Sequence, residues 1–93
     1  MRPMVPLIYH SPVHDHSTLA FATSVAGRLE VEILDLAGRR VRQLADDSDS
    51  SPGVHRFAFD GRGSDGQRLG AGVYFYRIVA AEGVRTNRFV IIR

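Results

Sequence analysis

The chain has 93 residues, of which 44% are hydrophobic, so it has the length and composition of one small globular domain with a single core. It contains no cysteine, which excludes disulfide bonds and thiolate metal sites. All twelve basic residues are arginine, but ten acidic residues are interleaved with them and the net charge is only +2, a balance that disfavours nucleic acid as a partner. No apolar run reaches the roughly 18 residues that a membrane-spanning segment needs, so no membrane insertion is expected.

Residues 1–16 have no regular pattern. Three prolines interrupt them, and because proline lacks a backbone N–H it is excluded from helix interiors and central strands. Alternating apolar residues over 5–9 still allow a short edge strand. We therefore expect an irregular segment over residues 1–16, with a possible edge strand, and the β domain over 17–93.

Two histidines, His14 and His16, flank Asp15 in this first segment. On an extended chain both imidazoles point to the same side, which makes them candidate ligands of a transition metal. The alternative is a polar loop in which histidines cluster by chance. We favour the polar loop, because a metal needs two to four ligands that converge with fixed geometry.

Four strands are predicted between residues 17 and 59. They cover residues 17–23, 28–36, 40–44 and 54–59. The second alternates most clearly, with Leu29, Val31 and Ile33 expected inward. Between the second and third, Asp35–Arg39 is expected to form a hairpin turn, in which Gly38 takes the left-handed conformation and Asp35 bonds to its own backbone. The acidic, small residues 45–53 predict a solvated loop.

The stretch from Ala71 to Ala80 is the strongest strand candidate. Tyr74, Tyr76 and Ile78 alternate with a second apolar set, so a central strand covered by a second sheet is predicted. Residues 60–72, which hold five of the nine glycines, precede it and predict a long shaped turn. The residues expected to matter for structure are Gly38, Phe59, Asp60, Gly61, Gly72, Tyr74 and Tyr76.

A last strand over residues 85–93 brings the total to about seven, at spacings of 8–12 residues. This pattern predicts an all-β fold of two packed antiparallel sheets. The glycines of 60–72 match neither a phosphate-binding loop nor a dinucleotide fingerprint, and no serine lies in a nucleophile turn. Side chains fill the interior of so small a sandwich, so we expect no enzyme activity and no cofactor.

The order of these motifs resembles a known family. The segments that carry the resemblance are Ser17–Phe21, Val31–Leu44, Gly53–Arg62, Asp65–Ile78 and Arg88–Arg93. They resemble FlgD-like C-terminal domains, which have an immunoglobulin-like fold and are related to the flagellar hook-capping protein. They are also similar to C-terminal sorting domains of the type IX secretion system. The chain departs from the family by having Phe59 where tryptophan is usual, and Ser11-Pro12 where Asn-Pro is common.

The resemblance implies an immunoglobulin-like antiparallel β-sandwich of about seven strands that is a non-catalytic C-terminal module of a larger secreted or cell-surface bacterial protein. Such a module would sort or anchor a covalently linked passenger domain through protein–protein interaction with the type IX machinery or a similar one. Candidate partner-binding residues are Arg88 and Arg93. One alternative is a hook-cap-like assembly scaffold. Another is a carbohydrate- or ligand-binding accessory module, which the absence of tryptophan disfavours. The oligomeric state is left open.

Overall fold

A computed structural model describes the backbone of residues 5–8 and all of residues 16–93. Its regular elements are all strands, and none of the described residues lies in a helix that could cross a membrane. The strands are β1 (Val5–Ile8), β2 (Ser17–Thr23), β3 (Gly27–Leu34), β4 (Arg40–Ser50), β5 (Gly53–Phe59), β6 (Gly72–Ala80) and β7 (Gly83–Ile91).

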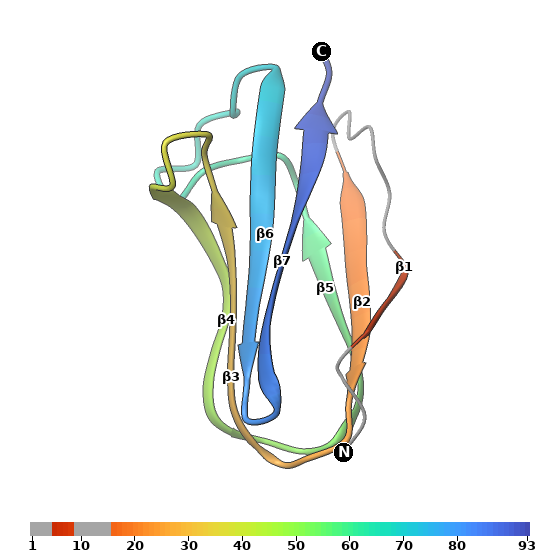
Figure 1. Ribbon diagram of the computed structural model, residues 1–93. Coiled ribbons are helices and arrows are strands. Elements are labelled where there is room, and N and C mark those ends of the chain that lie inside the picture. The colour runs from red at the N-terminus through yellow and green to blue at the C-terminus, as the bar shows by residue number, and fades with distance from the viewer. Residues whose placement is uncertain (1–4, 9–15) are drawn as a thin grey trace.

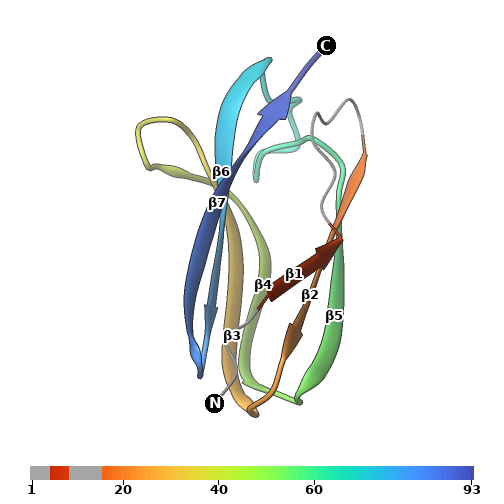
Figure 2. The same ribbon diagram turned by 45° about the vertical axis from the view of Figure 1, so that its right-hand side comes forward.

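The seven strands form two antiparallel sheets packed face to face (Figures 1 and 2). The smaller sheet has the order β1-β2-β5, and the larger has the order β4-β3-β6-β7. The predicted all-β sandwich is thus confirmed, with β6 inside the larger sheet, between β3 and β7. Strand β1 lies at an edge of the smaller sheet. An edge strand pairs on one side only, so a proline, which lacks the backbone N–H, is tolerated there.

The core lies between the two sheets and follows from the alternation along the strands. Leu29, Val31 and Ile33 of β3 are all buried, as predicted. They form one cluster with buried residues from both sheets. These residues are Leu19 and Phe21 of β2, Phe59 of β5, Tyr76 and Ile78 of β6, and Phe89 and Ile91 of β7. A gap in this cluster, lined by Ile33, Phe59, Tyr76 and other core residues, has a volume of about 20 Å³, which is about the size of one water molecule.

The two tyrosines of β6 differ in depth. Tyr76 is only 2% exposed, and burial raises the pKa of its phenol although a hydrogen bond with Asn87 acts in the opposite direction. The alternation over residues 71–80 places Tyr74 on the same face as Tyr76 and predicts that it is buried too, but Tyr74 is only half-buried, because it lies close to the end of the sandwich. Its ring stacks near Phe89, with 6.0 Å between the centroids, and its hydroxyl donates a 2.8 Å hydrogen bond to the carbonyl oxygen of Gly70.

The prediction of a solvated loop over residues 45–53 is wrong for most of that stretch. Strand β4 continues to Ser50, and Ala45, Asp46 and Asp47 pair with β3. Aspartate and serine have low strand propensity, but here their backbones complete the ladder while the aspartate side chains stay in solvent. Only residues 51–52 separate β4 from β5.

Strand β4 also carries extra residues relative to β3. Val31 pairs with Ala45 and Glu32 with Gln43, so Leu44 has no partner on β3 and is an inserted residue. Further along the two strands the pairing skips Val41 in the same way, so Val41 is a second inserted residue. Both are β-bulges, which bend a strand and free backbone groups from the ladder. The bulges turn Val41 and Leu44 against the core and leave the Val41 carbonyl oxygen available to the loop of residues 60–72.

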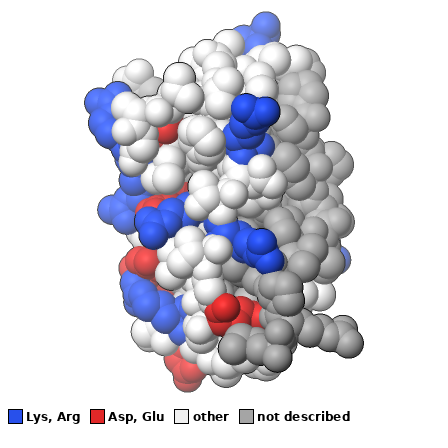
Figure 3. Space-filling view, viewed as in Figure 1, with Lys and Arg blue, Asp and Glu red and all other residues white. Residues whose placement is uncertain are grey.

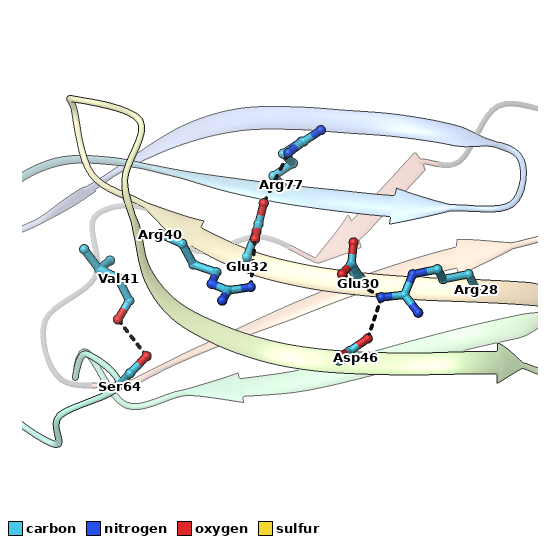
Figure 4. A network of polar contacts seen from close by, with 8 residues as sticks. All are labelled: Arg28, Glu30, Glu32, Arg40, Val41, Asp46, Ser64 and Arg77. Atoms are coloured by element: carbon cyan, nitrogen blue, oxygen red, sulfur yellow. Dashed lines mark hydrogen bonds and ion pairs between the residues drawn. The ribbon is translucent and has the colours of Figure 1, made fainter.

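The outer face of the larger sheet carries arginines and acids in alternation (Figure 3). Arg28 contacts both Glu30 and Asp46 at 2.8 Å, and Glu32 lies between Arg77 at 3.3 Å and Arg40 at 3.8 Å (Figure 4). The arginines of these pairs are exposed to solvent, so screening keeps each contribution to stability small, although the Glu32 side chain is only 14% exposed. Their effect is to balance the arginine charge on this face.

Candidate functional site

One end of the sandwich holds most of its irregular structure. The hairpin between β3 and β4, the loop of residues 60–72 and Arg93 all lie there, at the end marked C in Figure 1. We call the loop of residues 60–72 the glycine-rich loop. The hairpin lies beside its last residues, since Asp35–Ala37 and Ala71–Tyr74 line one shallow hollow.

The hairpin has the turn chemistry that the sequence predicts. Gly38 has a φ of 83° and donates a 2.9 Å hydrogen bond to the carbonyl oxygen of Asp35. The Asp35 carboxylate accepts hydrogen bonds from the backbone N–H of Arg39 and of Ala37. These bonds, the one from Arg39 above all, together with the Arg39 guanidinium hold the pKa of Asp35 below its ordinary value.

The glycine-rich loop folds back on itself as a small hairpin. The amide of Leu69 donates to the carbonyl oxygen of Gly61 at 2.9 Å, and the amide of Gly63 donates to that of Gln67 at 2.9 Å. Between these two bonds, Arg62 and Arg68 form an isolated antiparallel bridge. Gly61 is buried with a φ of 73°, and a side chain at Gly63 would press against the Val41 carbonyl oxygen. The backbone conformation therefore favours glycine at Gly61, and any side chain at Gly63 would make its neighbours shift by a few tenths of an ångström.

Hydrogen bonds from the sandwich fix the position of the loop. The amide of Ser64 donates to the carbonyl oxygen of Val41, the bulged residue of β4, at 2.8 Å, and the Ser64 hydroxyl reaches the same oxygen at 3.2 Å (Figure 4). Arg42, next along β4, donates from Nη1 to the Asp60 carboxylate and to the carbonyl oxygen of Arg62, both at 2.9 Å.

Arg93 holds the other side of the loop. Its Nη2 donates to the carbonyl oxygens of Leu69 at 2.7 Å and Gly61 at 3.0 Å, and its Nε also reaches Leu69 at 3.1 Å. A charged donor strengthens each of these bonds. The loop is thus a shaped surface held between two arginines, Arg42 and Arg93.

Asp60 titrates under opposing influences. Burial acts to raise its pKa, but hydrogen bonds from Arg42 and from the backbone N–H of Arg62 outweigh it, and the pKa lies below the ordinary 3.8. Because the folded pKa is lowered, the charged carboxylate stabilises the fold above pH 4 or so, and that contribution disappears as the pH falls through the folded pKa.

We therefore expect Asp60→Asn to lower the melting temperature at pH 6, where the wild-type carboxylate is charged. The difference from wild type should shrink below about pH 3 as the wild-type carboxylate gains its proton. Thermal unfolding followed by circular dichroism between pH 2 and 6 measures this. A difference that stays constant over the whole range would contradict a charged role for Asp60.

A groove runs between the glycine-rich loop and the start of β2. It is lined by His16, Asp60, Arg62 and Arg68. A neighbouring hollow shares His16 and Asp60 and adds Ser17, Thr18 and Arg42. Taken together, the described residues that line the groove and the hollow include three arginines, two hydroxyl groups and one carboxylate.

The residues singled out from the sequence fall in different places. Asp60 and Gly61 belong to the loop, and Arg93 contacts it directly. Gly72, with a φ of 150°, begins β6, while Phe59 is buried and packs edge-on against Phe89 at 6.1 Å. Arg88 belongs to β7, where it pairs across the sheet with Phe75 of β6.

The two histidine candidates are only partly described. His14 lies outside the described residues, and His16 is exposed at the groove. Among the residues that the structure describes, no three histidine or acidic side chains come together as a metal site would require.

Sequence reasoning missed Arg42, Arg62 and Arg68 as members of one site. Arg42 reads as an ordinary residue of a strand, and only the bulge at Val41 directs it to the loop. The pairing of Arg62 with Arg68 depends on a turn of Gly63–Gln67. The Gly-Ser-Asp-Gly run at residues 63–66 is the one signal that could have indicated this turn.

The comparisons with known proteins agree with this architecture. The family model of the FlgD Ig-like domain matches residues 12–83. Among solved structures, 99% of the chain superposes on part of dimeric latent PorU from Porphyromonas gingivalis, with a TM-score of 0.71 and 24% identity. For PorZ of the same organism, a surface component of the type IX secretion system, the TM-score is 0.62 over 95% of the chain, again with 24% identity.

The structure of FlgD from Xanthomonas campestris, a protein linked to the hook capping that is essential for flagellar assembly, gives a TM-score of 0.55 over 94% of the chain at 24% identity. The chain corresponds to 10% of PorU, 11% of PorZ and 64% of that FlgD structure. No curated protein sequence matches it.

The fold and the family model define the class: a small immunoglobulin-like β-sandwich of the kind found as one domain of larger proteins. Within that class, the chain belongs to the FlgD Ig-like domain family.

Proposed function

We propose that the chain is a non-catalytic module of a larger secreted or cell-surface bacterial protein, and that it sorts or anchors a covalently linked passenger through the type IX secretion system or a similar machine. The observation that carries the proposal is the family match over residues 12–83 together with the likeness to domains that make up only 10–11% of PorU and PorZ. In those proteins the matching domain is a small part of a much longer chain.

The geometry supports a role in protein interaction. The core of the described sandwich is filled, and the polar groups with the most elaborate bonding lie at the glycine-rich loop. A rigid surface loses little conformational entropy on docking, which favours recognition. Localisation at the cell surface or outside the cell is part of the proposal and rests on the PorZ likeness.

An export assay tests the proposal. A reporter carrying an export signal is fused ahead of residues 1–93 in a bacterium with a functional type IX system, and the reporter is measured in the medium, on the surface and in the periplasm. We expect the fusion at the surface or in the medium and the reporter alone in the periplasm. The same compartment for both would refute the sorting role.

Truncation is a poor way to find the contact residues. Deleting Arg88–Arg93 would remove Phe89 and Ile91, both part of the buried core, so loss of export would report unfolding. Arg88→Gln is a cleaner variant, because Arg88 is exposed on the outer face of β7, and Arg56→Gln on β5 is a control with the same change of charge. If Arg88 binds the machine, export falls in the first variant only.

A second candidate function is that of an assembly scaffold. It is favoured by the FlgD structure from X. campestris, of which the chain corresponds to 64%. A scaffold domain would restore motility to a flagellated strain whose hook-cap protein lacks its own Ig-like domain, whereas a sorting module would not. Swimming assays on such a chimera separate the two functions.

A further inference from the structure

Strand β5 is an outer strand of the smaller sheet, and one of its edges has no partner among the described elements. The order β1-β2-β5 places β2 on one side of it, and Figure 2 shows β5 along the right-hand margin of that sheet. Because neighbouring strands bond through alternate residues, the remaining N–H and C=O groups of Gly53–Phe59 point away from β2. None of the turn and loop hydrogen bonds between described residues engages these groups.

Apart from one charge, this edge lacks the devices that protect edge strands from further pairing. Strand β5 contains no proline and pairs with β2 in an unbroken register, from Thr23 opposite Gly53 to Ser17 opposite Phe59. Strand β4, at an edge of the larger sheet, differs from it, because β4 has two bulges and its Val41 carbonyl oxygen accepts a hydrogen bond from the loop. The backbone of β5 is therefore straight enough to accept a further strand along its whole length.

Arg56 supplies the one charge on β5 and is the middle residue of the strand. Its side chain is exposed and forms no ion pair with another described residue, and the residue opposite it on β2 is the uncharged Ala20. A second copy of the chain paired symmetrically along this edge would place two Arg56 side chains opposite one another, which destabilises a pairing. An acidic residue at that position would stabilise it, so the charge disfavours self-pairing and selects an acidic partner strand.

The neighbours of Arg56 define the rest of the partner. Val54, Arg56 and Ala58 lie on one face of β5, because side chains alternate along a strand. All three are exposed, Val54 to 55%. Side chains directly opposite one another on paired strands are in contact distance, so a strand added here would place an apolar residue beside Val54 and another beside Ala58.

We propose that the free edge of β5 binds an extended segment of a partner protein in which an acidic residue stands between two apolar residues, each two positions away from it. Backbone hydrogen bonds supply the affinity in this mode of binding, and the side-chain contacts with Val54, Arg56 and Ala58 supply the specificity. The inference goes beyond the proposed function. No part of the export machine is assigned to this edge, so Arg56→Gln remains a control in the export assay.

Two acetylated and amidated heptapeptides test the proposal: Thr-Val-Thr-Glu-Thr-Val-Thr, and the same peptide with lysine at its centre. Each reads the same in both directions, so each presents the same side chains to β5 in parallel and in antiparallel pairing. Binding to the full chain is followed by amide chemical shifts at constant ionic strength. We expect saturable shifts centred on residues 53–59 with the glutamate peptide, and an affinity for the lysine peptide that is lower by roughly fivefold or more. Equal affinities, or shifts centred on another strand, would overturn the proposal.

Charge reversal makes the assignment to Arg56 specific. Arg56→Glu should invert the preference, so that the lysine peptide binds more tightly than the glutamate peptide. Arg40→Glu is the matched control, because it makes the same reversal at an exposed position of β4, and it should keep the wild-type preference. An inverted preference in both variants would reduce the effect to net charge and refute the site.

A second copy of the chain is the competing occupant of this edge. Without peptide, we expect the amide shifts of residues 53–59 to be independent of protein concentration. Shifts that change with concentration at these residues, and that lose this dependence in Arg56→Glu, would show that a second copy pairs with β5 and would overturn the proposal.

Discussion

Replacing Tyr76 with alanine is expected to lower the free energy of unfolding by about 3–5 kcal/mol. Tyr76 is 2% exposed and is among the largest fully buried side chains of the described core. It lies at the centre of the larger sheet, opposite Ile33 of β3 and Asn87 of β7, and near the ring of Phe89. The alanine variant leaves a cavity that the rigid ladder cannot close. For a domain of this size the loss approaches the total stability.

Urea unfolding followed by circular dichroism measures this loss, and Tyr74→Ala is the matched control. Both tyrosines belong to β6 and face the same side, but Tyr74 is only half-buried, so its replacement should cost less, about 1–3 kcal/mol. Equal costs at the two positions, or a larger cost at Tyr74, would mean that the core is not centred where the structure places it.

Replacing Arg93 with alanine is expected to lower the free energy of unfolding by about 1–2 kcal/mol, toward the lower end of the range for charged hydrogen bonds because the side chain is exposed. The variant removes three hydrogen bonds to the carbonyl oxygens of Leu69 and Gly61. Gly61 keeps the bond from the Leu69 amide, so the loop should loosen without unfolding.

The control for Arg93 is Arg56→Ala, which removes the same side chain from an exposed position on β5. We expect a change within about 0.5 kcal/mol there. Chemical denaturation and backbone amide shifts distinguish the two variants, because only Arg93→Ala should move the resonances of residues 60–70. Undisturbed loop resonances in Arg93→Ala would show that the three hydrogen bonds do not hold the loop.

The strands could be predicted because their burial follows from alternation. The inward residues of β3 and the turn at Asp35 and Gly38 are determined by neighbours in sequence, and the structure agrees with them. The extent of β4 could not be predicted in this way. Its aspartates have low strand propensity, and they are extended only because the backbone of β3 offers partners.

The candidate site was harder to foresee for a related reason. The many glycines of residues 60–72 predict a shaped turn, but they do not indicate which side chains come together at that turn. Arg42 reaches Asp60 because of a bulge, and Arg93 reaches Gly61 across 32 positions in the sequence. Contacts of this kind depend on tertiary packing, which leaves no periodic trace in a single sequence.

The proposed role in recognition requires the glycine-rich loop to be a rigid surface, and amide hydrogen exchange of Ser64 and Leu69 tests this most directly. Both amides donate to carbonyl oxygens, at 2.8 Å to Val41 and at 2.9 Å to Gly61. We expect both to exchange far more slowly than an unstructured amide in the wild type, and Leu69 to lose that protection in Arg93→Ala. Exchange of both amides at the rate of an unstructured chain in the wild type would show that the loop is not a rigid surface.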